Sequence, residues 1–194
     1  MSQSRLLRSA DYPRMPWKNG TGSTLEIARD AGDGLDGFGW RLSIADVGES
    51  GGFSAFTGYQ RVITVLEGAG MRLEVDGQRS RDLTSLDAFA FDGGSTVQCE
   101  LIDGPIRDFN LIYSPKRYAA RLQWLRADGG LKLFSSASTL LLFAAESGVS
   151  LTFDGQRSEV LGQHDCLHLE TTGALAELKL DGTGACCLIE LTPR

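Results

Sequence analysis

Apolar and polar residues alternate along much of the chain, in short segments that end at glycine or aspartate. In residues 40–44 this places Trp40, Leu42 and Ile44 on one face, the period of a half-buried strand. The same pattern predicts further strands at 61–66, 71–75, 109–113, 139–143, 149–153, 174–180 and 187–191. Many short strands separated by Gly and Asp turns are typical of an all-β sandwich or barrel.

A five-residue segment occurs twice. Asp-Gly-Gln-Arg-Ser stands at 76–80 and again at 154–158, an offset of 78 residues. The same offset, without gaps, aligns Gly70 with Gly148, Leu73 with Leu151, Val75 with Phe153, Leu83 with Leu161, Asp87 with Asp165, Phe89 with Leu167 and Leu111 with Ile189. Chance recurrence of a common turn is the alternative, but the apolar register on both sides favours a duplicated β unit. Proline interrupts the strand pattern at 114–117, where we expect the linker between the copies.

Composition and charge exclude several classes of protein. The 194 residues are enough to bury a core without disulfides. Nineteen Lys and Arg against 25 Asp and Glu give a net charge of −6, which argues against a nucleic-acid partner, because such proteins need a basic surface. The longest apolar run, 140–145, is too short to cross a bilayer, and residues 1–13 lack the apolar core of a signal peptide. The four cysteines form no CxxC pair, so we expect reduced thiols and a cytoplasmic protein without a membrane partner.

The densest polar motif precedes both repeats, at 17–27, and reads Trp-Lys-Asn-Gly-Thr-Gly-Ser-Thr-Leu-Glu-Ile. Its glycines permit close backbone approach, and Asn19 suits a turn. The segment either closes one mouth of a barrel or enters a strand with Trp17 as a hydrophobic plug. The motif resembles the signature of the HutD/Ves family, which is close to W-x-N-G-G-G-x-T-x-E-I, although Thr21 stands where that family usually has glycine.

Three further segments extend this resemblance over most of residues 17–113: FGWRLSIADV at 38–47, FSAFTGYQRVITVLEG at 53–68 and RDFNLIY at 107–113. The resemblance implies a bicupin, two cupin-like β-barrels in one chain, and the 78-residue offset supports this independently. We expect residues 1–115 to form an N-terminal segment and the first barrel, and residues 116–194 to form the second. The family is associated with histidine utilisation and is suspected of modulating it by binding a small intermediate.

Cupins that bind metal resemble one another in an HxH pair, a nearby Glu and a further His. At the corresponding positions this chain has Phe53, Ser54, Ala55, Phe56, Gln60 and Arg61. The second motif, at 86–91, has no histidine either. We therefore expect no metal and no cofactor, because these residues are poor ligands and Arg61 would repel a cation and attract an anion.

The only two histidines, His164 and His168, lie in the second repeat. In a strand their Cα atoms are about 13 Å apart, which is too far for easy chelation. The favoured interpretation is a pair of surface or interface histidines. Cys166 shares a strand face with His168 and is the best nucleophile for a catalytic alternative, but packing as a small hydrophobe is more common for a cysteine.

Arginines in the first repeat are the candidates for ligand binding. Glu26 lies mid-strand, and a buried glutamate needs a cationic partner. Arg41 and Arg61 both suit that role, and whichever arginine Glu26 does not hold is left to bind an anion. We expect Arg61 to point into the first barrel beside apolar residues. Flat walls and orienting polar groups complete the predicted site: Trp17, Asn19, Trp40, Ser43, Phe91 and Asn110.

These features predict a metal-free protein that binds a small anionic metabolite. The link to histidine breakdown rests on the resemblance and makes two carboxylates, urocanate and N-formylglutamate, the natural candidates. One alternative is a metal-independent isomerase or hydrolase that uses Glu26 or the pair Cys166 and His168. Another is a protein whose barrels only present an interaction surface. Exposed sheet edges favour a homodimer that covers them.

Overall fold

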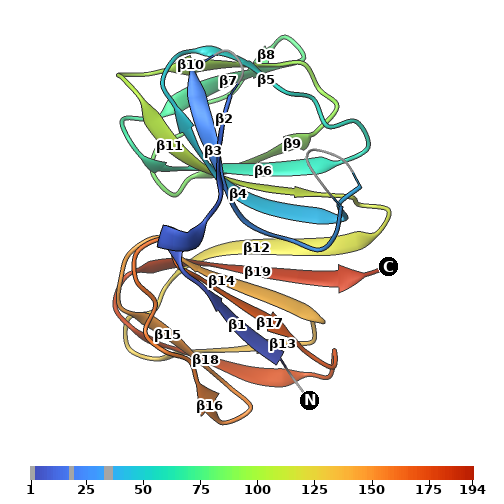
Figure 1. Cartoon of the computed structure of the whole chain (residues 1–194), viewed down its shortest axis with the longest axis vertical. Helices are drawn as coiled ribbons and strands as arrows, with labels where there is room; N and C mark the ends of the chain where they lie inside the picture. The colour runs from blue at the N-terminus through green and yellow to red at the C-terminus, as the bar shows by residue number, and fades with distance from the viewer. Residues whose placement is uncertain (1–2, 18–19, 33–36) are drawn as a thin grey trace. The chain divides into compact units, whose positions relative to one another are not determined.

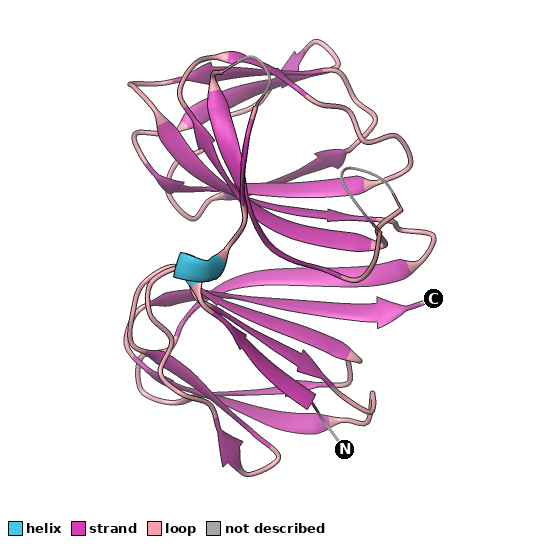
Figure 2. Cartoon of the chain, viewed as in Figure 1, coloured by secondary structure: helices cyan, strands magenta, loops and turns pink. Residues whose placement is uncertain are grey.

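The computed structural model describes residues 3–17, 20–32 and 37–194. The chain divides into two compact units. The N-terminal barrel is Pro13–Arg117, and the C-terminal barrel combines Met1–Tyr12 with Tyr118–Arg194. Both consist of antiparallel strands, with one 3-10 helix, η1 (Ser9–Asp11), among the described residues (Figures 1 and 2).

Two sheets form the N-terminal barrel. The six-stranded sheet has the order β2 (Arg14–Pro16), β3 (Gly22–Arg29), β4 (Trp40–Val47), β11 (Ile106–Tyr113), β6 (Gln60–Glu67) and β9 (Ala88–Asp92). The four-stranded sheet has the order β5 (Gly51–Phe53), β10 (Val97–Leu101), β7 (Met71–Val75) and β8 (Gln78–Arg79). Their inward-facing apolar residues form one buried core that includes Ile63, Val65, Met71, Leu73 and Val97.

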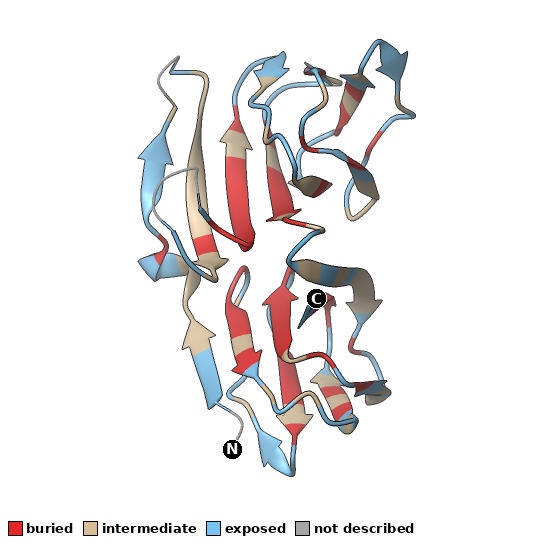
Figure 3. Cartoon of the chain, turned by 90° about the vertical axis from the view of Figure 1, so that its right-hand side faces the viewer, coloured by how far each residue is buried: buried red, intermediate tan, exposed pale blue. Residues whose placement is uncertain are grey.

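The C-terminal barrel repeats this plan. Its five-stranded sheet has the order β1 (Gln3–Leu7), β17 (Cys166–Glu170), β14 (Thr139–Ala144), β19 (Ala185–Pro193) and β12 (Tyr118–Arg126). Its four-stranded sheet has the order β13 (Leu131–Ser135), β18 (Ala176–Gly182), β15 (Val149–Phe153) and β16 (Gln156–Arg157). Leucines dominate the core between the two sheets. Figure 3 shows that the buried residues lie mainly in the strands at the middle of the sheets.

The first strand differs from the expected division at 1–115. Strand β1 pairs with β17, so it extends a sheet of the C-terminal barrel. Leu6 packs against that barrel's core, and Asp165 accepts hydrogen bonds from Arg8 Nη1 and Ser9 N, each at 2.8 Å. The polar composition of this edge strand gave no signal for its distant partner. At the other boundary β11 ends at Tyr113 and β12 begins at Tyr118, so residues 114–117 connect the two units.

Duplication of one unit is visible in the backbone. The turns Asp76–Gly77 and Asp154–Gly155 join β7 to β8 and β15 to β16, and all four residues have positive φ, as a type I′ hairpin turn requires. Strand β17 lies 78 residues after β9 at both ends. The offset is not uniform, because β6 has one extra residue at a bulge between Val65 and Glu67, whereas β14 pairs with β19 without a register shift. A uniform offset of 78 would make Thr139 the counterpart of Arg61. The strand register instead makes Leu140 the counterpart.

The two turn glycines provide a test of the duplication. Gly77 has φ +80° and Gly155 has φ +73°, and an added Cβ would meet nothing within 4 Å at either position. Gly77→Ala and Gly155→Ala should therefore each lower the free energy of unfolding by about 1–2 kcal/mol through backbone strain alone. Urea denaturation measures this, with Gly51→Ala as the control, because Gly51 also has open space around its Cβ position but no positive φ. Equal stability of the turn variants and the control would contradict the turn assignment.

No helix in the part of the chain that the structure describes is long and apolar enough to span a membrane.

Candidate functional site

A cavity of about 590 Å³ lies in the N-terminal barrel. Its wall comes from β2, β3, β4, β5, β6 and β11 and from the chain just after β2 and β5. The lining residues are Met15, Pro16, Trp17, Thr24, Arg41, Ser43, Ala45, Gly52, Phe53, Ser54, Phe56, Arg61, Asp108, Asn110 and Ile112. The wall thus combines apolar side chains with polar ones, three of which are charged.

Arg61 is the most unusual of these side chains. It is only 6% exposed, and its guanidinium carbon lies 5.6, 5.5 and 5.1 Å from the ring centres of Phe53, Phe56 and Phe91. Cation–π attraction at such distances offsets part of the cost of burying the charge. Its Nη1 donates to the Ser54 carbonyl at 3.2 Å, and its buried Nε has no hydrogen-bond partner among the described residues.

Asn110 and Asp108 extend this polar group along β11. Arg61 Nη2 donates to Asn110 Oδ1 at 2.9 Å, which fixes the orientation of the amide. Asn110 Nδ2 then donates to Asp108 Oδ1 at 2.5 Å. Asp108 is 1% exposed, and burial raises its pKa to about 7, although Arg61 and the Asn110 hydrogen bond act in the opposite direction. Burial also lowers the pKa of Arg61, to about 10, so the guanidinium remains charged at neutral pH.

Glu26 holds the other arginine of the cavity. Its Oε2 accepts from Arg41 Nε at 2.6 Å and also contacts Arg29 Nη2, while its Oε1 accepts from Arg29 Nε at 2.7 Å. Burial alone would raise the pKa of Glu26, but these hydrogen bonds lower it below its usual value. Of the two partners proposed for Glu26, the structure thus selects Arg41 and adds Arg29, and it leaves Arg61 without a carboxylate partner among the described residues.

Only some of the remaining residues of the predicted site line the cavity. Trp17, Ser43 and Asn110 line the cavity. Trp40 does not, because successive residues of β4 face opposite sides of the sheet and Arg41 and Ser43 take the cavity side.

Two more predicted positions do not line the cavity directly. Phe91 packs in the core against Arg61 and so lies behind the wall. Asn19 falls outside the described residues.

Asp108, Phe53 and Phe56 were absent from the predicted ligand set. The strand containing Asp108 was expected to begin at Phe109, whereas β11 begins at Ile106. Extending the predicted strand by one residue includes Asp108, which alternation places on the same face as Asn110. The two phenylalanines had been considered only as poor metal ligands, and the rings that surround a guanidinium are brought to it by tertiary packing.

The donor set of the cavity does not suit a transition metal. It offers two arginines and one carboxylate, and cations repel a metal ion. Among the described residues no group of three His, Cys, Asp or Glu side chains could hold a metal ion.

The histidines and Cys166 belong to the packing of the C-terminal barrel. His164 is buried and stacks on Phe143, with ring centres 5.7 Å apart and an interplanar angle of 8°, so the expectation of a surface histidine is wrong for this residue. His168 Nε2 lies 2.7 Å from Glu170 Oε1. Cys166 is fully buried, which raises the pKa of its thiol well above the usual value. A buried, protonated thiol is a poor nucleophile.

Gly22, from the polar motif, is required where β3 meets β4. An added Cβ would lie 2.3 Å from the Asp46 carbonyl oxygen and 2.9 Å from the Trp17 ring, which lines the cavity. We expect Gly22→Ala to lower the free energy of unfolding by about 1–3 kcal/mol through overpacking. Urea denaturation beside Gly51→Ala measures the effect, and a Gly22 variant as stable as that control would contradict the close approach.

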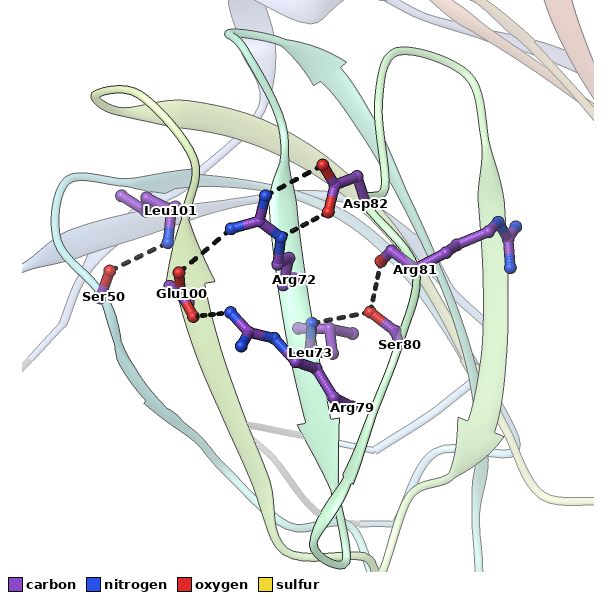
Figure 4. Close-up of polar contacts among 9 residues, drawn as sticks. All are labelled: Ser50, Arg72, Leu73, Arg79, Ser80, Arg81, Asp82, Glu100 and Leu101. Atoms are coloured by element: carbon purple, nitrogen blue, oxygen red, sulfur yellow. Dashed lines mark hydrogen bonds and ion pairs between the residues drawn. The ribbon is translucent and has the colours of Figure 1, made fainter.

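Other arginines of this barrel lie on its surface. Figure 4 shows Arg72 between Asp82 and Glu100, and Arg79 paired with the second oxygen of Glu100. Ser80 Oγ in the same view accepts from Leu73 N and donates to the Arg81 carbonyl. Exposed ion pairs of this kind contribute about 0–1 kcal/mol each, so these arginines serve as controls for Arg61.

The family model described as HutD matches residues 9–188. The chain belongs to the HutD family. Over the full length of both chains, it is 63% identical to an uncharacterized 21.2 kDa protein from the hutC 3′ region of Pseudomonas putida. It is 33% identical to the protein Ves of Escherichia fergusonii, with 85% of this chain and 89% of that protein aligned. The solved structure of HutD from Pseudomonas fluorescens SBW25 has a TM-score of 0.88 at 59% identity and covers 99% of this chain and 100% of its own.

Cupin-like proteins share this fold at low identity. The pirin YhhW of Escherichia coli, solved in complex with nickel(II), has a TM-score of 0.68 at 10% identity, covering 99% of this chain and 100% of that one. The predicted all-β bicupin fold and the predicted HutD/Ves membership are confirmed.

Proposed function

We propose that this HutD-family protein binds a small carboxylate in the cavity around Arg61 and thereby modulates histidine utilisation. The observation that carries the proposal is the guanidinium itself. It is buried among three phenyl rings, it contacts only neutral acceptors among the described residues, and its Nε is unpartnered there. A buried charge without an ionised partner costs free energy, part of which a bound carboxylate would recover through charge-assisted hydrogen bonds to the guanidinium.

The link to histidine breakdown has separate support. It comes from family membership and from the hutC 3′ region assigned to the Pseudomonas putida relative. Urocanate and N-formylglutamate are the two carboxylates to test. Urocanate is planar and conjugated and would lie against Phe53 or Phe56, whereas N-formylglutamate offers a second carboxylate. Cytoplasmic location and a homodimer stay predictions.

A thermal-shift titration with both compounds tests the proposal. We expect at least one of them to raise the melting temperature of the wild-type protein at millimolar concentration, because a ligand that binds only the folded state stabilises it. The same mixtures, followed by ultraviolet absorbance and chromatography, should show no consumption of the ligand. Turnover would favour the isomerase or hydrolase hypothesis, and the lack of any shift with either compound would favour the interaction protein.

A further inference from the structure

A carboxyl group in the cavity wall affects how an anion can bind there. Arg41, Arg61 and Asp108 are the charged residues that line the cavity. Arg41 is paired with Glu26, which Arg29 shares, whereas Arg61 has no carboxylate within ion-pair distance among the described residues. If Asp108 were ionised, a bound carboxylate would lie beside a second anion, and like charges at short range in a buried site repel strongly.

Hydrogen bonding determines where a proton on Asp108 would lie. Asn110 Oδ1 is occupied by Arg61, so the Asn110 Nδ2 group must face Asp108 as a donor. Asp108 Oδ1 can then only accept. A proton on the carboxyl group therefore belongs on Oδ2, where it can be donated to a ligand in the cavity that Asp108 lines.

We propose that Asp108 is a ligand-contacting residue: it binds the carboxylate in its protonated form, donating from Oδ2, and binding takes up one proton from solvent. This inference rests on the proposed function. Arg61 supplies the charge, and the protonated Asp108 supplies a neutral donor on the same anion. The cavity therefore favours an anion with several hydrogen-bond acceptors over a cation.

Among the titratable groups around Asp108 that are described below, Asp108 is the one whose pKa lies near neutrality. Burial raises the pKa of Asp108 to about 7, and burial raises the pKa of Cys99, from β10, to about 12. Arg61 from β6 remains charged, with a pKa of about 10. Asp46 from β4 has its pKa lowered by Arg107 and Arg14, which outweigh its partial burial. Arg41, also from β4, is paired with Glu26.

Calorimetry of the wild-type protein counts the proton directly. The probes are N-formylglutamate and 3-(2-furyl)acrylate, a planar analogue of urocanate without the imidazole, because neither titrates between pH 5 and 9. Binding enthalpies in pairs of buffers with different ionisation enthalpies, MES and bis-Tris at pH 5.5 and HEPES and Tris at pH 8.5, give the number of protons taken up. We expect about one proton per ligand at pH 8.5 and close to none at pH 5.5, with affinity falling about tenfold per pH unit above pH 7.

Asp108→Asn mimics the protonated form and provides the second measurement. It should bind within about threefold of wild type at pH 5.5, take up no proton and lose the pH dependence. Asp103→Asn, at an exposed position in the turn before β11, is the control and should behave as wild type. Binding by wild type without proton uptake at pH 8.5 would overturn this inference and leave the proposed function standing. The lack of binding of these probes and of urocanate at either pH would overturn both.

Discussion

Arg61→Ala should lower the affinity for the bound carboxylate by about 2–5 kcal/mol, the range for losing one partner of a buried charge pair. Of the two arginines in the described cavity wall, Arg61 is the one that forms no ion pair with a described carboxylate, and its Nε is unpartnered there. Alanine removes both the charge and the donor, and nothing else in the described wall replaces them. Isothermal titration of the wild type and the variant, with the carboxylate that shifts the melting temperature, measures the difference.

Folding should survive this substitution. Arg61 forms no ion pair with a described residue, so its removal leaves no carboxylate newly stripped of a salt bridge. Arg79→Ala is the matched control, because the Arg79 side chain is 58% exposed and pairs with Glu100 on the outer face of the same barrel. Equal affinity of wild type and Arg61→Ala would place the ligand elsewhere.

Asp108→Asn should change how stability depends on pH. The pKa of Asp108 rises from an ordinary value of 3.8 to about 7 on folding. Between these values the folded protein keeps a proton that the unfolded chain has lost, so the free energy of unfolding falls as pH rises through this window. At about 1.4 kcal/mol per pKa unit, wild type should lose about 2–3 kcal/mol relative to Asp108→Asn between pH 5 and pH 8.

Urea denaturation of both proteins at pH 5, 6, 7 and 8 measures this difference. Above pH 7 the two stability curves should run parallel, because Asp108 is then ionised in both states. Asp103→Asn should follow wild type throughout. If the difference between wild type and Asp108→Asn stays constant from pH 5 to pH 8, then Asp108 does not titrate in this range.

Most of the fold was predictable because strand alternation and turn chemistry are local. Trp40, Leu42 and Ile44 alternate with Arg41 and Ser43, and the structure places a strand there. The Asp-Gly turns need positive φ, and both have it. The partner of β1 was not predictable, because five exposed or half-buried residues carry no record of a strand more than 150 positions away.

The site was predictable in part for the same reason. Arg61 stands out because an arginine in an apolar strand needs an explanation, and Glu26 had to have a cationic partner. The role of Asp108 depends on the amide of Asn110 being oriented by Arg61 on a neighbouring strand. Such a relay exists only after β6 and β11 pair, so no pattern along the chain could reveal it.

A crystal structure of the protein with the carboxylate that raises its melting temperature tests the central claim most directly. We predict one carboxylate group in the cavity of the N-terminal barrel, with its oxygens within hydrogen-bond distance of the Arg61 guanidinium and of Asp108. A saturated complex in which the ligand lies outside this cavity, with Arg61 untouched, would contradict the account.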